Sequence, residues 1–135
     1  MRILGIDLGR KRIGVALGDT ENQVVVGLPT LANDSETFAK LKEIIDRENI
    51  GKLIIGWPKT MSGQNGKQTN FTGRWGEQAN KILQIEVEYS DERLSSKMAR
   101  DSLMEVKKDL TKEDIDQAAA VLILQGYLDR AQNSI

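Results

Sequence analysis

Residues 3–8 read Ile-Leu-Gly-Ile-Asp-Leu, and this nearly continuous apolar run limits the possible folds more than any other feature of the chain. A strand this apolar is covered on both faces, as in sheets that carry helices on each side. A second run of this kind, at residues 52–57, follows a segment with helical spacing. Together the two runs predict an α/β fold in which the central strands are parallel.

The remaining patterns complete a five-stranded mixed sheet flanked by helices. The expected strands are 3–8, 13–17, 24–28, 52–57 and one from Ile85 that ends at Asp91-Glu92. The expected helices begin near residue 36, near Gln68, near residue 96 and at Thr111, and the third runs to about Lys107. The first three strands follow one another closely enough to form an antiparallel meander. Helical crossovers make the first, fourth and fifth strands parallel.

Three of the expected helices carry N-terminal capping signals. Asp34 or Ser35 can cap the first helix, and Ser95 or Ser96 can cap the short one. The segment Thr111-Lys-Glu-Asp114 has the form of a capping box, with Asp in place of the usual Glu or Gln. Asp114 therefore has a structural explanation as a capping acid.

Composition restricts the possible chemistry. The 135 residues include no cysteine and no histidine, which excludes thiolate sites, Ser-His-Asp triads and His-ligated zinc. Carboxylates, lysines and hydroxyls remain as candidates. The length suits one domain spanning residues 1–135, without a second lobe. Neither a targeting segment nor a membrane-spanning stretch is visible, so we expect a cytoplasmic protein with no membrane partner.

Asp7 is the anomaly within the first apolar run. An ionised carboxylate in a buried strand is unfavourable unless it is paired or binds a metal. It lies near the carboxyl end of the strand, where open α/β sheets place their sites. One interpretation is a ligand for a hard cation, since Mg²⁺ prefers oxygen. The alternative is a strand-end aspartate that caps the turn at Gly9.

Two further acidic positions can approach Asp7. Asp91-Glu92 ends the fifth strand, and the carboxyl ends of parallel strands lie at one edge of the sheet. Considered alone, this pair is explained equally by ordinary charged residues of a solvated loop. Asp116 is more unusual. Its helical face continues with a buried stripe, which consists of Ala119, Ala120, Ile123 and Tyr127. Charge is disfavoured there, so we expect Asp116 to have a chemical role.

Carboxylates that converge without a counter-charge repel one another. A divalent metal removes this conflict. Two magnesium ions about 4 Å apart could activate a water and stabilise the leaving oxygen of a phosphodiester. The sequence therefore predicts a metal site at one edge of the sheet.

Basic side chains accompany this edge. Lys11 and Arg12 follow Asp7, and Lys59 and Lys67 flank the loop after the fourth strand. They could hold phosphates beside a metal, although ordinary solvated turn charge is the alternative. Trp57 and Trp75 could stack on bases, but packing at a strand end and on a helix face explains them as well.

Four ordered motifs resemble one family over essentially the whole chain. They are GIDLGRKRIGVALGD, IIGWPKTMSGQNGKQ, SDERLSS and DIDQAAAVLILQGYLD. They are similar to those of the YqgF or RuvX family of pre-16S rRNA nucleases, which are related to RuvC-type Holliday junction resolvases. The resemblance implies an RNase H-like nuclease domain and metal-dependent phosphodiester hydrolysis with Mg²⁺ or Mn²⁺. It also implies trimming of the 5′ end of precursor 16S rRNA during ribosome biogenesis.

The resemblance carries over to single residues. Asp7 matches the acid of the first strand, Asp91-Glu92-Arg93 matches an Asp-Glu-Arg motif, and Asp116 matches the acid before the Ala-Ala of the last helix. Asp7, Glu92 and Asp116 are the expected catalytic residues and metal ligands, with Asp91 as the alternate to Glu92. Lys11, Arg12, Lys59 and Lys67 are the expected substrate-binding residues.

Other functions remain open at this level. The protein could resolve branched DNA, as Holliday junction resolvases do, or it could be a non-catalytic RNA-binding factor of ribosome assembly. A sugar kinase or actin-like ATPase begins with a similar Gly-Ile-Asp-x-Gly pattern, but 135 residues do not supply the second lobe that closes on ATP. The expected partners are precursor rRNA, branched DNA and ribosomal precursor particles, and the chain is expected to act as a monomer or a homodimer.

Overall fold

The computed structural model of the chain describes residues 1–57, 66–91 and 111–133. Its strands are β1 (Arg2–Leu8), β2 (Arg12–Asp19), β3 (Val25–Ala32), β4 (Ile50–Trp57) and β5 (Glu86–Asp91). Its helices are α1 (Thr37–Glu48), α2 (Lys67–Leu83) and α4 (Lys112–Asn133). The short helix expected near residues 95–107 lies outside the described residues.

The sheet has five strands in the order β3-β2-β1-β4-β5. β1 pairs antiparallel with β2, and β2 pairs antiparallel with β3. On the other side, β4 runs parallel to β1 and β5 runs parallel to β4. The predicted meander and the predicted parallel strands are therefore both confirmed. The carboxyl ends of β1, β4 and β5 meet at one edge of the sheet.

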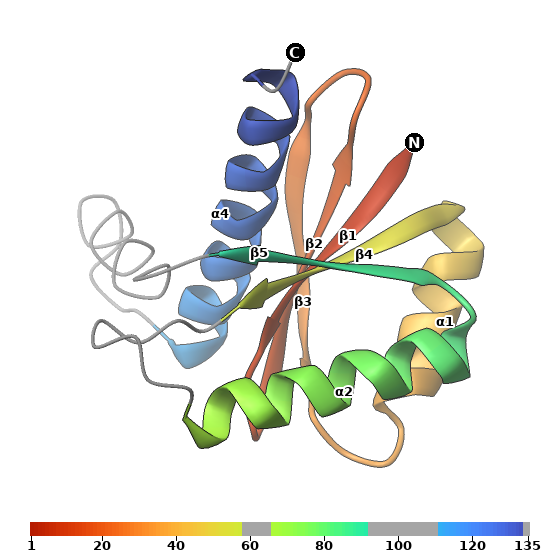
Figure 1. The fold of residues 1–135 in the computed structure, drawn as a ribbon, viewed down its shortest axis with the longest axis vertical. Coiled ribbons are helices and arrows are strands. Elements are labelled where there is room, and N and C mark those ends of the chain that lie inside the picture. The colour runs from red at the N-terminus through yellow and green to blue at the C-terminus, as the bar shows by residue number, and fades with distance from the viewer. Residues whose placement is uncertain (58–65, 92–110, 134–135) are drawn as a thin grey trace.

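Helices cover both faces of the sheet (Figure 1), with α1 and α2 on one face and α4 on the other. Alternate residues of each strand therefore face different cores. Leu4, Ile6 and Leu8 of β1 pack with α1 and α2, whereas Ile3 packs with α4. Asp7 has the parity of Ile3, so it faces α4. This explains why the β1 run is apolar almost throughout.

The third strand is longer than expected, because β3 continues to Ala32 instead of ending at Leu28. The observed strand therefore contains Pro29, which directly follows Leu28. β3 is an edge strand of the sheet, and an edge strand tolerates proline, since an outward-facing N–H needs no partner in the ladder. The extra residues carry Thr30, whose hydroxyl donates to the carbonyl of Glu113 on α4 at 3.2 Å.

The helix starts differ in how well they could be predicted. Neither Asp34 nor Ser35 is the N-cap of α1; Glu36 holds that position and makes no side-chain capping bond. Asp34 instead accepts from the Glu36 amide at 2.9 Å within the preceding turn. The capping box of α4 is confirmed in both directions. The amide of Thr111 donates to the Asp114 carboxylate at 3.2 Å, and the amide of Asp114 donates to the Thr111 hydroxyl at 3.1 Å.

No helix in the described part of the chain is both long enough and apolar enough to cross a membrane.

Candidate active site

Asp7 lies one residue before the end of β1, beside β2. Its partner across the antiparallel ladder is Gly14. The side chain is largely buried on the face of the sheet that α4 covers. The rigid central strand therefore holds one carboxylate at the edge where the parallel strands end.

Helix α4 passes directly over this point. A Cβ atom on Gly14 would overlap the carbonyl oxygen of Asp116, so only glycine permits this approach of helix and strand. Two further contacts fix the helix to the meander. The side-chain amide of Gln117 donates to the carbonyl of Leu28 at 2.9 Å, and the Thr30 hydroxyl contacts Glu113 as described. Asp116 is thereby placed beside Asp7, as the sequence predicted.

The predicted apolar stripe below Asp116 is confirmed. Ala119, Ala120 and Ile123 are buried in the core between α4 and the sheet, and Tyr127 packs against the same core. Only 20% of the Asp116 side chain is exposed. Asp116 is therefore a charge at the head of a buried helix face.

Arg12 neutralises Asp116 in this structure. Its Nε donates to Oδ2 of Asp116 at 2.9 Å, which joins the start of β2 to the first turns of α4. The sequence predicted Arg12 as a phosphate-binding residue, and the prediction did not include this ion pair. The sequence did contain one indication of this ion pair. Arg12 and Asp116 both lie on segments whose neighbouring apolar residues are expected to be buried, and charged residues in such places are usually paired.

The charge of Asp7 is disfavoured by its surroundings. Burial, and next the negative charge of Asp116, raise the pKa of Asp7 from 3.8 to about 6. The carboxyl is therefore destabilised in its ionised form at neutral pH. Such a perturbed acid in a specific charged setting is typical of a functional site.

The turn between β1 and β2 is held firmly. The amide of Gly9 donates to the carbonyl of Arg12 at 3.0 Å. Asn33 spans the turn, because its backbone amide donates to the carbonyl of Lys11 at 2.9 Å and its side-chain amide donates to the carbonyl of Gly9 at 2.8 Å. The alternative interpretation, in which Asp7 caps the turn at Gly9, has no support among the contacts of the described residues. Asn33 makes the side-chain contact that closes this turn.

The other expected site residues are placed as follows. Lys11 and Lys67 are exposed, and Lys67 begins α2. Asp91 is exposed at the end of β5, which is separated from β1 by β4. Glu92 and Lys59 lie outside the described residues. Within residues 1–57, 66–91 and 111–133, no group of three acidic side chains is arranged to hold a metal ion.

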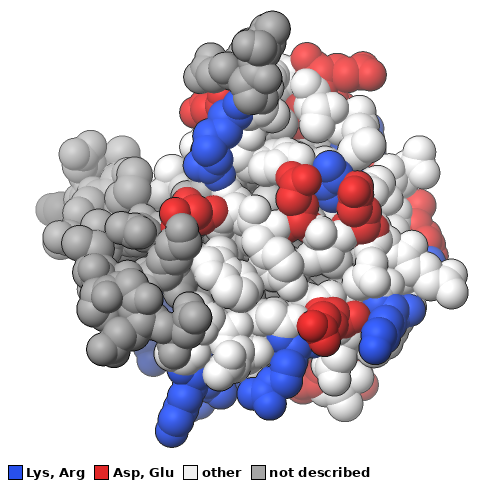
Figure 2. Space-filling view, in the orientation of Figure 1, with Lys and Arg blue, Asp and Glu red and all other residues white. Residues whose placement is uncertain are grey.

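Basic side chains also gather over α2, along the lower margin of the molecule in Figure 2. The helix begins beside the candidate site, because the side-chain amide of Gln68 lies 3.4 Å from the carbonyl of Leu8, the residue after Asp7. The guanidinium of Arg10 lies over the ring of Phe71, 4.7 Å from its centroid. The turn after β1 and the first turns of α2 thus share one basic edge.

The fold is that of the RuvC-type resolvases, an RNase H-like fold. A Thermus thermophilus RuvC, solved in complex with a Holliday junction substrate, matches with a TM-score of 0.59 and 12% sequence identity, over 99% of this chain and 98% of that one. A fowlpox virus resolvase, solved with Holliday junction DNA, matches with a TM-score of 0.55 and 13% identity, over 97% and 99% of the two chains.

The chain belongs to the RuvX family. The family profile, described as "Holliday junction resolvase", matches residues 1–130. Relatives are similar over nearly their whole length. One from Sulfurihydrogenibium sp. (strain YO3AOP1) is 43% identical over 131 residues, covering 96% of this chain and 90% of the relative. One from Caldanaerobacter subterraneus is 37% identical over 139 residues, covering 99% and 100%. Both carry the name "Putative pre-16S rRNA nuclease".

Proposed function

We propose that this protein is a divalent-metal-dependent nuclease that hydrolyses phosphodiester bonds in the 5′-end processing of precursor 16S rRNA. The observation that carries the proposal is the burial of Asp7 beside Asp116 at the carboxyl end of β1. The names of the relatives support the choice of substrate. We further propose that residues 1–135 act as one nuclease domain in the cytoplasm, as a monomer or homodimer.

The donor set fits Mg²⁺ or Mn²⁺. The chain has neither His nor Cys, and oxygen ligands select hard cations. The raised pKa of Asp7 is itself an argument for a cation, because a positive charge would offset both the burial and the repulsion from Asp116. Asp7, Asp116 and Glu92 would hold the metal, with Asp91 as the alternate to Glu92. A bound metal would supply electrostatic stabilisation of the negative charge that builds on the phosphate.

The protein itself contributes rigidity and charge. β1 and the turn bridged by Asn33 hold Asp7 in place. Arg12 stabilises the Asp116 carboxylate. The exposed Lys11 and Lys67, together with Lys59, would bind the phosphates on either side of the cleaved bond, so affinity should fall as salt rises.

Branched DNA is the second candidate substrate. The description of the family favours it, as does the fold shared with proteins solved with Holliday junctions. A four-way junction has two symmetric strands to cleave, so this activity would require a homodimer. A third candidate is a non-enzymatic RNA-binding role on ribosomal precursor particles. The basic side chains of the turn after β1 and of the first turns of α2 would suffice for this role, without Asp7 and Asp116.

A substrate panel tests the proposal. The purified protein is incubated with a precursor 16S rRNA fragment that includes the 5′ extension, with a four-way DNA junction and with ATP, each with magnesium and with EDTA. We expect magnesium-dependent cleavage of the precursor rRNA and no hydrolysis of ATP. Cleavage of the junction alone would replace the substrate with branched DNA. Binding of the precursor rRNA without cleavage, both with magnesium and with EDTA, would leave the non-enzymatic role.

A further inference from the structure

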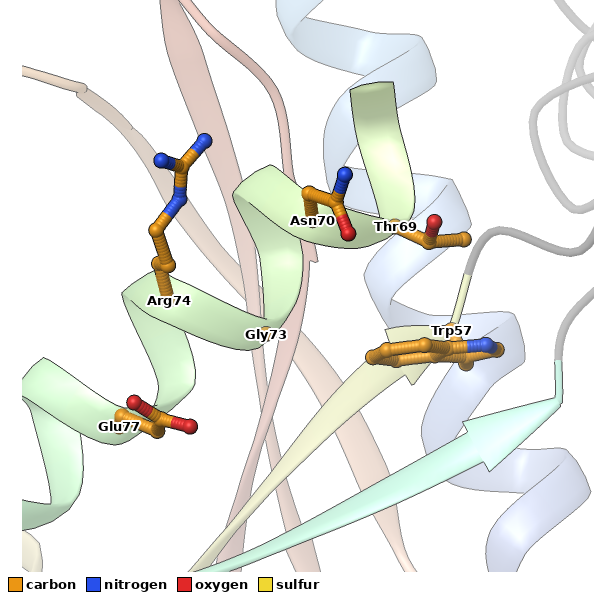
Figure 3. A pocket seen from close by; sticks show the side chains of 6 residues that line it. All are labelled: Trp57, Thr69, Asn70, Gly73, Arg74 and Glu77. Carbon is orange, nitrogen blue, oxygen red and sulfur yellow. The ribbon is translucent and has the colours of Figure 1, made fainter. Parts of the chain in front are cut away.

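A second feature lies on the other face of the same edge of the sheet. Trp57 is the last residue of β4, and α2 passes beside it. Between them is a pocket of about 390 Å³, within the range of about 300–1,000 Å³ typical of small-molecule sites. Its lining residues are Trp57, Thr69, Asn70, Gly73, Arg74 and Glu77. Figure 3 shows the indole ring beneath the first turns of the helix, with the polar side chains following along α2.

The indole ring is held in a fixed orientation. The ring of Tyr89 meets it edge to face, with the centroids 5.0 Å apart and the planes at 78°. Tyr89 is fixed in turn against Gly76 of α2, where a Cβ atom would overlap the tyrosine hydroxyl. An aromatic platform that is already ordered loses little side-chain entropy when a ligand stacks on it.

Helix α2 leaves room beside the ring because residue 73 is glycine. A Cβ atom at Gly73 would meet only the edge of Trp57, at 3.9 Å. Polar groups surround this space. Asn70 carries an amide that donates and accepts, and Glu77 carries a carboxylate that accepts from amino groups. Arg74 also lines the pocket, and Figure 3 shows its guanidinium pointing away from the indole ring.

The pocket is close enough to the candidate site to take part of the same ligand. Asp7 and Trp57 both lie at the carboxyl ends of neighbouring parallel strands, β1 and β4, and Ile55 pairs with Ile6 two residues before Trp57. Gln68, on the first turn of α2, lies 3.4 Å from the Leu8 carbonyl. A polynucleotide at Asp7 that crosses the edge of the sheet would reach the pocket with an adjoining nucleotide.

We propose that this pocket binds one unpaired nucleobase that flanks the phosphodiester cleaved at the Asp7 site. The base stacks on Trp57, its polar edge meets Asn70 and Glu77, and Arg74 pairs with the adjoining phosphate. The carboxylate of Glu77 favours bases with an amino group, as carboxylates do when they accept from cytosine N4. The inference rests on the proposed function, because it needs a polynucleotide at the site.

The test measures binding of a fluorescently labelled single-stranded RNA in EDTA, and cleavage of the precursor rRNA in magnesium. Trp57→Ala should weaken the binding of single-stranded RNA about 5- to 150-fold, the range of one lost base–aromatic stack. Trp57→Phe should restore most of it. The affinity for a fully paired RNA duplex should not change, because its bases cannot leave the helix to enter the pocket.

Two further variants separate the pocket from the fold. Gly73→Leu fills the space beside the ring while it keeps Trp57, and leucine favours a helix more than glycine does. It should weaken binding as Trp57→Ala does. Arg74→Gln should weaken binding more than Lys81→Gln, because both remove an exposed charge from α2 but only Arg74 lines the pocket. Circular dichroism of each variant confirms that the fold is kept.

The outcomes distinguish the inference from the proposed function. If the parent protein cleaves the rRNA while Trp57→Ala and Gly73→Leu bind single strands as tightly as the parent, the base pocket is wrong and the nuclease stands. Selective loss of single-strand binding in both variants supports the pocket. A parent protein that neither cleaves nor binds any nucleic acid would overturn both proposals together.

Discussion

Replacing Asp7 with asparagine should stabilise the metal-free protein above about pH 6. In the folded protein, burial and the Asp116 carboxylate raise the pKa of Asp7 from 3.8 to about 6. Between these two pH values the folded state holds a proton that the unfolded chain has lost, so stability falls as the pH rises through this window. At about 1.36 kcal/mol per pH unit, ionised Asp7 destabilises the fold by up to about 3 kcal/mol at pH 8. Asparagine keeps the shape and removes the charge.

Urea denaturation of the parent and of Asp7→Asn, at pH 4 and pH 8 without metal, measures this difference. We expect the variant to be more stable by up to about 3 kcal/mol at pH 8 and to keep little of this gain at pH 4, where Asp7 is protonated in the folded state and the unfolded chain has lost only part of this proton. Magnesium should stabilise only the parent, since a ligand that binds the folded state raises its stability. Asp46→Asn is the matched control, because it removes an exposed carboxylate whose pair with Lys42 contributes little. An equal gain at both pH values, or a loss at pH 8, would refute the electrostatic reasoning.

Three further substitutions test how the site is held. Gly14→Ala should destabilise the protein by about 1–3 kcal/mol, because the new methyl group overlaps the Asp116 backbone and forces α4 away from β2; urea denaturation measures this, and an unchanged midpoint would contradict the close contact. Arg12→Gln should raise the pKa of Asp7 above about 6, because it removes the positive charge beside Asp116. A carbon-13 NMR titration of the Asp7 carboxyl group measures this pKa, and a lower value would contradict the role of the Arg12–Asp116 ion pair. Thr111→Ala should lower the stability by about 1 kcal/mol through loss of one capping bond, and no change in the melt would mean that the box is not formed in solution.

Much of the fold followed from local patterns. The nearly continuous apolar runs of β1 and β4 predicted a sheet covered on both faces, and the helical crossovers predicted which strands are parallel. The stripe below Asp116 predicted the face of α4 that packs on the sheet. Each of these features depends on the spacing of apolar residues within one segment, and this spacing can be observed in the sequence alone.

Features that depend on a distant part of the chain were not predictable. Arg12 and Asp116 are 104 positions apart in the sequence, so neither position alone reveals the ion pair. Pro29 reads as the end of a strand, and only its place at the sheet edge explains why β3 continues. The pocket beside Trp57 needs the crossing of α2 over the end of β4, which no local pattern specifies.

Paramagnetic broadening of backbone amide signals by Mn²⁺ tests the central claim most directly. Mn²⁺ takes oxygen ligands as Mg²⁺ does, and it broadens the NMR signals nearest to it. In the parent protein at pH 8, the amides of Leu8 and Gly14 should broaden first, and excess Mg²⁺ should restore them. In Asp7→Asn and Asp116→Asn this broadening should be lost, whereas Asp46→Asn should behave as the parent does. Broadening at Leu8 and Gly14 that persists unchanged in Asp7→Asn would contradict the assignment of a metal site to these carboxylates.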